Sequence, residues 1–289
     1  MGSQVVKSVP VSEIVDFEPE LELFRDMLVD LSERCLMFIQ APGGRGKTCL
    51  LRLMRRRCEE EGIPCCWVDF RGESYDNPHL TLAREICDQL GLVPRHLAEA
   101  LLPFSPLVTE VSAEVQEVSG SRIITAGGNV IECQQAVMTF SATNENLRQR
   151  YVRERLKRAF AADLANLAAD KGTAVCFLDH FEDVSDEEES WLLEALLGPV
   201  RENELKRVIV VTGGRRWPKI DDWEWEDSTH LINSLPPMSV EHIKVYAKRV
   251  QVEISHEEAE FCWRACRGGI PYFMGMVVKN LRAKVEVRP

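Results

Sequence analysis

Apolar residues along this chain show two patterns, helical spacing and short continuous runs, and stretches of the two kinds alternate. Helical spacing comes first, over residues 17–34, at Leu21, Leu23, Phe24, Leu28 and Leu31. A short apolar run at 35–39 then stops at a loop with several glycines, and a helical stretch begins at Cys49. The pattern predicts a helix, a buried strand, a tight loop and a second helix, in that order.

The same succession of strand and helix recurs further along the chain. We predict buried strands at 64–70, 173–178 and 207–212, and helices at 79–91, 144–170 and 187–198. Strands that alternate with helices are typical of a parallel sheet. We therefore expect an α/β fold in three layers with a central parallel sheet.

Two segments depart from this rhythm. Residues 104–141 alternate and are rich in valine, and Gly127 and Gly128 separate two β-branched runs, which predicts a β-hairpin-rich insertion. After residue 237 the pattern is helical, with helices predicted at 239–250, 255–267 and 270–284. We expect a core at 1–234, with the insertion at about 104–141, and a small helical domain at 235–289.

Composition narrows the class of protein. The 289 residues carry a net charge of −11, which lowers the expectation of general nucleic-acid binding, because phosphates are neutralised by surplus lysine and arginine. No stretch reaches the roughly 20 apolar residues that span a bilayer, and the N-terminus lacks the apolar core of a signal peptide. The ten cysteines show no zinc-binding spacing. We expect reduced thiols in a cytoplasmic protein without membrane contact.

The loop after the first strand matches the phosphate-binding template GxxxxGK[ST], with Ala41 in place of the first glycine. Glycines let backbone N–H groups point at phosphate oxygens, and the following helix N-terminus adds positive potential. Lys47 supplies charge for the β- and γ-phosphates, and Thr48 supplies a hydroxyl for Mg²⁺. We expect nucleotide contacts from Pro42, Gly43, Gly44, Arg45, Gly46, Lys47, Thr48 and Cys49.

An acidic motif follows the third predicted strand. Asp179 is expected at the carboxyl edge of the sheet, beside the glycine loop, where it holds Mg²⁺ directly or through water. Glu182 lies just beyond, placed to orient or deprotonate an attacking water, and Asp183 is a weaker candidate for that role. The alternative is a solvated acidic strand end. We assign catalysis to Lys47, Asp179 and Glu182, and interpret His180 as a packing or supporting residue.

The strand at 207–212 ends near charged residues. Thr212 or Arg215 is a candidate sensor of the γ-phosphate, because a polar group at the end of a neighbouring strand reaches the same edge of the sheet. The alternative is an ordinary surface loop. Arg201 and Arg207 are candidates for an arginine that completes the site of a neighbouring subunit, only because they precede this strand.

Four motifs together resemble the STAND branch of AAA+-related P-loop NTPases, the group of apoptotic and immune-receptor NTPases and origin-recognition-like ATPases. They are APGGRGKT, FLDHFED, VIVVTGG with the arginines after it, and SLPPMS followed by GGIP. The resemblance implies a switch that binds ATP or ADP with Mg²⁺, hydrolyses ATP slowly and assembles in the ATP state. It also implies that the helical domain is a lid over the nucleotide, with Pro271 near the base.

The chain departs from this family at residues 16–20, where the family has a Gly-Arg-Glu motif. The absence of an NKxD-type guanine motif favours ATP over GTP. The resemblance further implies protein partners or self-assembly, for which the insertion and the lid are the candidate surfaces.

Two other functions stay open. A DNA-associated AAA+ ATPase is one, because residues 148–158 form a basic stretch, although a solvated helix face explains the same charges. A scaffold that binds nucleotide without hydrolysing it is the other. The acidic segment at 221–227 carries Trp223 and Trp225, which either contact a partner or pack in the core.

Overall fold

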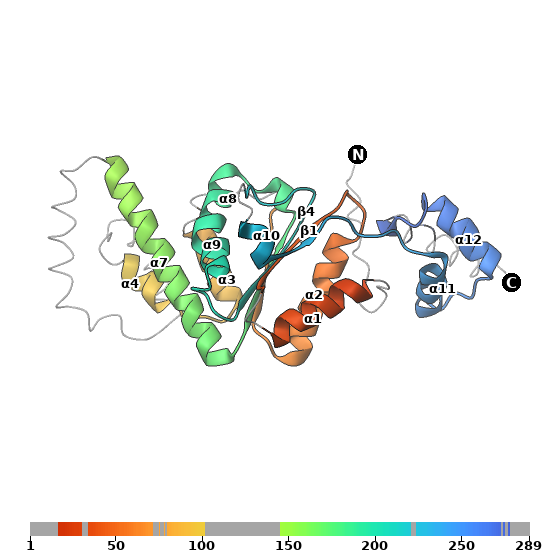
Figure 1. Cartoon of the computed structure of the whole chain (residues 1–289), viewed down its shortest axis with the longest axis horizontal. Coiled ribbons are helices and arrows are strands. Elements are labelled where there is room, and N and C mark those ends of the chain that lie inside the picture. The colour runs from red at the N-terminus through yellow and green to blue at the C-terminus, as the bar shows by residue number, and fades with distance from the viewer. Residues whose placement is uncertain are drawn as a thin grey trace, which may run out of the picture. The chain divides into compact units, whose positions relative to one another are not determined.

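In a computed structural model, the chain divides into two compact units (Figure 1). The first comprises Met1–Ser74, Thr173–Val184 and Ile209–Pro289, and the second comprises Tyr75–Gly172 and Ser185–Val208. The structure describes residues 17–30, 34–71, 75, 78, 80–101, 145–220, 224–272, 274 and 277. The predicted β-rich insertion at 104–141 lies outside these residues and stays a prediction.

The first unit is built around a five-stranded sheet with the strand order β2-β3-β4-β1-β5. The pairs β2–β3, β4–β1 and β1–β5 are parallel. The strands are β1 Leu36–Gln40, β2 Cys65–Asp69, β3 Ala174–Asp179, β4 Val208–Gly214 and β5 Thr229–Ile232. The expected α/β fold with a central parallel sheet is thus confirmed, and the order places β4 between β1 and β3.

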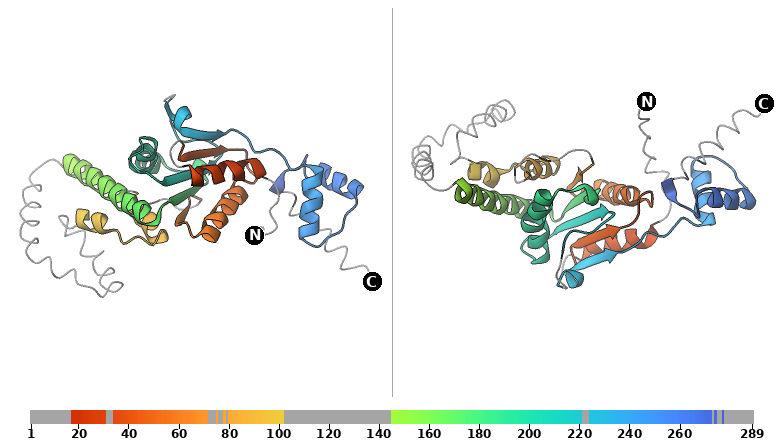
Figure 2. Two further views of the ribbon diagram at one scale, coloured as in Figure 1. Left: turned by 60° about the horizontal axis from the view of Figure 1, so that its bottom comes forward. Right: turned by 90° about the horizontal axis from the view of Figure 1, so that it is seen from above.

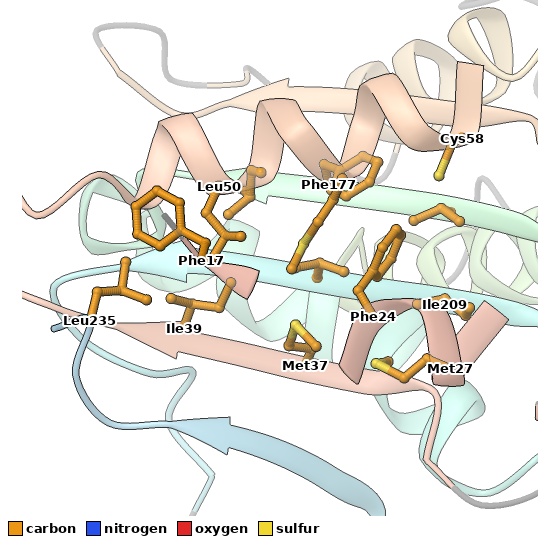
Figure 3. Close-up of a cluster of buried hydrophobic side chains, with 14 of the residues drawn as sticks. Phe17, Phe24, Met27, Met37, Ile39, Leu50, Cys58, Phe177, Ile209 and Leu235 are labelled. Carbon is orange, nitrogen blue, oxygen red and sulfur yellow. The ribbon is translucent and has the colours of Figure 1, made fainter. Parts of the chain in front are cut away.

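Helices α1 (Glu18–Val29) and α2 (Lys47–Glu61) cover one face of this sheet. Phe24 of α1 and Met54 of α2 pack with Phe177 of β3 in one buried cluster, together with alternate residues of the strands (Figure 3). The intervening strand residues are buried as well, which explains the continuous apolar runs of the sequence. Burying each large apolar side chain contributes about 1.5–3 kcal/mol, so this cluster dominates the stability of the unit.

Within the described residues, the second unit is helical. Its longest helix, α7 (Glu145–Lys171), packs against α4 (Arg95–Leu101), where buried Asp163 accepts hydrogen bonds from the N–H groups of His96 and Leu97 at the start of α4. Phe160 of α7 lies 5.2 Å from the ring of Trp191. The remaining helices are α3 Thr81–Gln89, α8 Asp186–Leu192, the π-helical turn η5 Leu193–Leu197 and α9 Gly198–Arg201.

Two small helices follow β5 in the first unit. They are α11 (Val240–Arg249) and α12 (His256–Ala265), which Figure 2 shows beyond β5 in the chain. Each begins with a serine capping box, and a separate cluster around Ile243 and Cys262 joins them. The predicted helices at 239–250 and 255–267 are therefore confirmed. The boundary between core and lid at residue 235 stays a prediction.

The structure differs from the sequence prediction in several elements. Strand β4 continues through Gly213 and Gly214, two residues beyond the strand predicted at 207–212. The strand β5 and the helix α4 were not predicted, and residues 224–227 of the acidic segment at 221–227 lie in the short helix α10 (Glu224–Ser228). Trp225 is 8% exposed and 6.4 Å from the ring of Phe38, so it packs in the core; Trp223 lies outside the described residues.

Two observations bear on the environment of the chain. No helix in the described part of the chain is long and apolar enough to cross a membrane. The cysteines within the described residues are free thiols, and most of them are buried.

Candidate functional site

The glycine loop connects β1 to α2 and is held in shape by its glycines. Gly44 and Gly46 have φ values of 80° and 95°, in the left-handed region that glycine adopts without a steric penalty. A Cβ on Gly46 would lie 2.7 Å from Cζ of Phe17, closer than real Cβ atoms come to other atoms. Gly46 is also the N-cap of α2 and has no side chain, so it leaves the N–H groups of the first turn to an anion.

Lys47 is the first residue of α2, and its side chain turns back into the loop. Its Nζ donates to the carbonyl oxygens of Ala41 at 2.6 Å and Pro42 at 3.2 Å. Burial lowers the pKa of Lys47, whereas the negative charges of Glu182 and Asp179 act in the opposite direction. The two carboxylates predicted from the strand end are therefore close enough to the loop lysine to interact with it.

Asp179 is the last residue of β3 and is fully buried. Its Oδ1 accepts a hydrogen bond of 2.9 Å from the backbone N–H of His180. Its Oδ2 accepts no hydrogen bond from any residue that the structure describes. A buried carboxylate oxygen with a free lone pair is the donor that a hard cation requires, so Asp179 fits the Mg²⁺ site expected from the sequence.

Glu182 lies in the short 3-10 turn η4 (Phe181–Asp183), directly after β3. Its Oε2 accepts the backbone N–H of Arg215 at 2.8 Å, and its Oε1 lies 3.1 Å from Nε of the same residue. The guanidinium of Arg215 also lies over the glycine loop, because a Cβ on Gly43 would be 3.2 Å from its Nη2. Arg215 therefore connects the glycine loop to Glu182.

The glycine pair at the end of β4 makes room for this arrangement. A Cβ on Gly214 would lie 3.2 Å from Oε2 of Glu182 and 3.0 Å from Cβ of Phe181. A Cβ on Gly213 would lie 3.6 Å from Oδ1 of Asp179. Since β4 runs between β1 and β3, the missing side chain of Gly214 lets the acidic motif approach the loop across the intervening strand, whereas Gly213 mainly makes room for Leu51 of α2, 3.0 Å from its Cβ position.

A second set of charged side chains, those of His180, Asp69 and Arg71, lies around Asp179. Nδ1 of His180 lies 3.0 Å from Oδ1 of Asp69 and 3.2 Å from Oδ2 of Asp179. Burial acts to lower the pKa of His180, but contact with Asp179 outweighs burial and the pKa is raised. Arg71 holds Asp69 from the other side, with Nη2 2.7 Å from Oδ2. Burial acts to raise the pKa of Asp69, and the hydrogen bonds from Arg71 reverse this, so its pKa is lowered.

The structure thus brings Lys47, Asp179, Glu182 and Arg215 to one edge of the sheet. Thr212, the other predicted sensor, is 2% exposed and pairs with Phe38 inside the sheet, two residues before β4 ends. Thr48 and Cys49 are half-buried in the first turn of α2, and burial raises the pKa of the Cys49 thiol.

The helical domain touches the glycine loop near the predicted Pro271. The N–H of Tyr272 donates to the carbonyl oxygen of Gly44 at 3.2 Å. The two arginines considered for a neighbouring site have partners within this chain. Arg201 pairs with Glu202 at 2.8 Å, and Arg207 donates to the carbonyl of Gly172 at 3.4 Å.

Sequence reasoning missed Asp69, Arg71 and Phe17 as parts of the site. Asp69 ends the apolar strand β2 as Asp179 ends β3, so the signal that identified Asp179 was available for Asp69 too. Phe17 carried no comparable signal, because its contact with Gly46 depends on how α1 packs against α2.

No protein-family model matches the chain, and no curated protein matches its sequence. Among the solved structures that match is the Aeropyrum pernix ORC1 protein in complex with DNA, with 14% sequence identity and a TM-score of 0.48. The match covers 96% of this chain and 63% of that protein, so the chain spans less than two thirds of its length. A similarity at this level says nothing about activity or partners.

Proposed function

We propose that this protein is an ATP-binding, slowly hydrolysing NTPase of the STAND type that acts as a nucleotide-dependent switch. The observation that supports this best is that Arg215 lies both at Gly43 of the glycine loop and 3.1 Å from Oε1 of Glu182, so the loop and the acidic motif with buried Asp179 meet at one edge of the sheet. A glycine turn that preceded a helix by chance would not be expected to have two carboxylates close to its lysine. The order of the four sequence motifs supports the STAND type and the preference for ATP over GTP.

Each residue has a defined role in this proposal. The loop amides of Gly43, Gly44 and Gly46 bind phosphate oxygens, and Lys47 leaves its carbonyl partners to neutralise the β- and γ-phosphates. Thr48 and Asp179 hold Mg²⁺, which supplies charge neutralisation on the phosphates when bound. Glu182 directs the attacking water.

Arg215 is the sensor in this proposal. Its guanidinium lies beside both Gly43 and Glu182, so a γ-phosphate on the loop competes with Glu182 for the same cation. ATP therefore frees Oε1 of Glu182 from the guanidinium, while Oε2 keeps its hydrogen bond from the backbone N–H of Arg215, and ADP leaves both contacts in place. The contact between Tyr272 and Gly44 supports a route by which the state of the loop reaches the helical domain, where an assembly surface is expected.

The test follows molecular mass and hydrolysis in the same samples. Size-exclusion chromatography with light scattering is run on wild type and Glu182→Gln without nucleotide, with ADP, and with ATP and Mg²⁺, while phosphate release is measured. We expect ATP to drive assembly, and Glu182→Gln to retain the assembled state and stop hydrolysis. The matched control is Glu204→Gln, which makes the same substitution at an exposed position outside the site and should behave like wild type.

Other results would favour the alternatives. Tight ATP binding without phosphate release or a change of mass supports the scaffold that does not hydrolyse nucleotide. Salt-sensitive binding to duplex DNA supports the DNA-associated ATPase. The basic stretch is a weak basis for the latter, because Arg153 pairs with Glu187 at 3.0 Å and Lys157 forms ion pairs with Glu154 and Glu194.

A further inference from the structure

His180 has a backbone conformation that its residue type does not favour. Its φ is 58° and its ψ is 44°, in the left-handed region, where glycine is unstrained and a residue with a Cβ is not. Non-glycine residues in such conformations cluster at functional sites. The side chain of His180 is therefore a candidate for a role that glycine cannot perform.

The contacts of His180 involve both oxygens of Asp179. Its backbone N–H donates to Oδ1 at 2.9 Å, and its Nδ1 lies 3.2 Å from Oδ2. The same Nδ1 lies 3.0 Å from Oδ1 of Asp69. The imidazole is therefore placed between two carboxylates at the ends of adjacent strands, and each carboxylate attracts a polarised or protonated ring.

Asp69 is itself fixed in place. The parallel register of β2 and β3 pairs Asp69 with Asp179, and the N–H of Phe70 donates to the carbonyl of Asp179 at 3.2 Å. Arg71 binds the Asp69 carboxylate through Nη2 at 2.7 Å and through its backbone N–H at 3.1 Å. Asp69 is thus a rigid, charge-compensated anchor, which makes it a poorer cation ligand than Asp179.

We propose that His180 is a positioning residue that links Asp179 to the anchored Asp69 and thereby holds the Asp179 carboxylate in the orientation that binds the divalent cation. This rests on the proposed function, in which Asp179 holds Mg²⁺. Nδ1 of His180 lies 3.2 Å from Oδ2, but neither atom has a hydrogen-bond partner among the described residues, so the link is an electrostatic contact and Oδ2 keeps a lone pair for the cation. Supporting residues of this kind change metal affinity rather than the binding of the other ligands.

The test compares metal-dependent with metal-independent nucleotide binding in the full chain. The affinity for a fluorescent, non-hydrolysable ATP analogue is measured with Mg²⁺ and in excess EDTA. We expect His180→Gly to reduce the gain in affinity from Mg²⁺ by about 10- to 100-fold and to leave the affinity in EDTA unchanged. Glycine suits the left-handed backbone, so the variant is expected to fold at least as well as wild type.

Two further variants separate the side chain from the backbone. His180→Asn should recover part of the gain, because asparagine tolerates the left-handed region and places its side-chain nitrogen at the same number of bonds from Cα as histidine Nδ1. Asn203 has a left-handed φ of 59° and lies outside the site. Asn203→Gly removes the same kind of backbone strain there, so its nucleotide affinity should equal that of wild type both with Mg²⁺ and in EDTA.

The possible failures are distinguishable. If wild type binds no nucleotide in either condition, the proposed function and this inference both fail. If wild type gains affinity from Mg²⁺ and His180→Gly keeps the whole gain, the positioning role is wrong and the proposed function stands. With Mn²⁺ in place of Mg²⁺, ¹⁴N coupling in the electron paramagnetic resonance spectrum would make the imidazole a direct ligand and overturn the positioning role.

Discussion

At the scale of single residues, the ring of Phe17 packs directly against the backbone of Gly46. The ring of Phe17 occupies the position that a Cβ on Gly46 would need, and Phe17 has itself a left-handed φ of 77° at the start of α1. The glycine loop is therefore shaped both by its own backbone preference and by a side chain that precedes it in the chain. Phe17 is 2% exposed, so its ring has little freedom to move aside.

Gly46→Ala should be more destabilising than left-handed strain alone explains. Strain costs about 1–2 kcal/mol of the free energy of unfolding, and the contact with Phe17 adds to it. Gly62→Ala is the matched control, because Gly62 has a φ of 70° at the other end of α2 and no atom within 4 Å of its Cβ position. Urea unfolding of both variants measures the difference, and equal losses would contradict the contact.

Adding Phe17→Ala to Gly46→Ala separates the two contributions. The double variant should recover the part of the loss that comes from the contact and keep the part that comes from backbone strain. The single variant Phe17→Ala has its own cost, because it removes a buried ring, so the comparison is made as a complete double-mutant cycle on the free energy of unfolding.

At the scale of elements, the end of β4 decides how the acidic motif approaches the loop. Gly213 and Gly214 extend the strand past Thr212, and only there does Arg215 meet Glu182. A Cβ on Gly214 would lie 2.8 Å from the carbonyl oxygen of Arg216, and it would also press on the η4 turn through Phe181 and on the carboxylate of Glu182. The strand end thus controls the position of the proposed catalytic carboxylate.

Gly214→Ala should separate nucleotide binding from hydrolysis. We expect single-turnover phosphate release to fall by about 10- to 100-fold, because a small displacement of the group that directs water is enough for such a loss. The affinity for ADP should fall less than the rate, because Gly214 meets the glycine loop only through its carbonyl oxygen, which accepts the N–H of Ala41 and is kept in alanine. An unchanged rate of phosphate release would show that Glu182 is not held by this contact. Gly172 has a φ of 93° and lies outside the site, so Gly172→Ala controls for the general effect of replacing a glycine by alanine.

At the scale of the whole molecule, the proposed site belongs to one of the two compact units. The glycine loop, the acidic motif and Arg215 all lie in the unit that contains the sheet, whereas α4 and α7 lie in the other. A ligand that binds only the folded site stabilises the elements that form it. The two units should therefore respond differently to nucleotide.

Hydrogen exchange measured by mass spectrometry tests this difference. With Mg²⁺ and ATP we expect slower exchange in peptides from residues 40–50, 179–183 and 213–216, relative to the protein without nucleotide. Peptides from α4 and from residues 150–171 of α7 should change much less. Lys47→Ala controls for nucleotide acting elsewhere and should abolish the effect. Equal protection of both units would contradict a site confined to the first.

Much of this fold could be read from local patterns. The burial of β1, β3 and β4, the helical face of α1 and the conformation of the glycine loop depend on residues close together in the sequence, so composition and spacing predict them. Strand β5 was missed because its four residues, THLI, show too short an apolar run. The π-helical turn η5 was missed because its apolar residues fit an ordinary helix equally well.

The sequence by itself determined the chemistry of the loop and the carboxylates that accompany it. Only the tertiary structure decided which residues meet: Arg215 with Glu182, His180 with Asp69, and the ring of Phe17 with Gly46. The physical reason is that local patterns encode backbone conformation and burial, whereas the neighbours of a side chain depend on strand order. In the order β2-β3-β4-β1-β5, residues distant along the chain lie at adjacent strand ends.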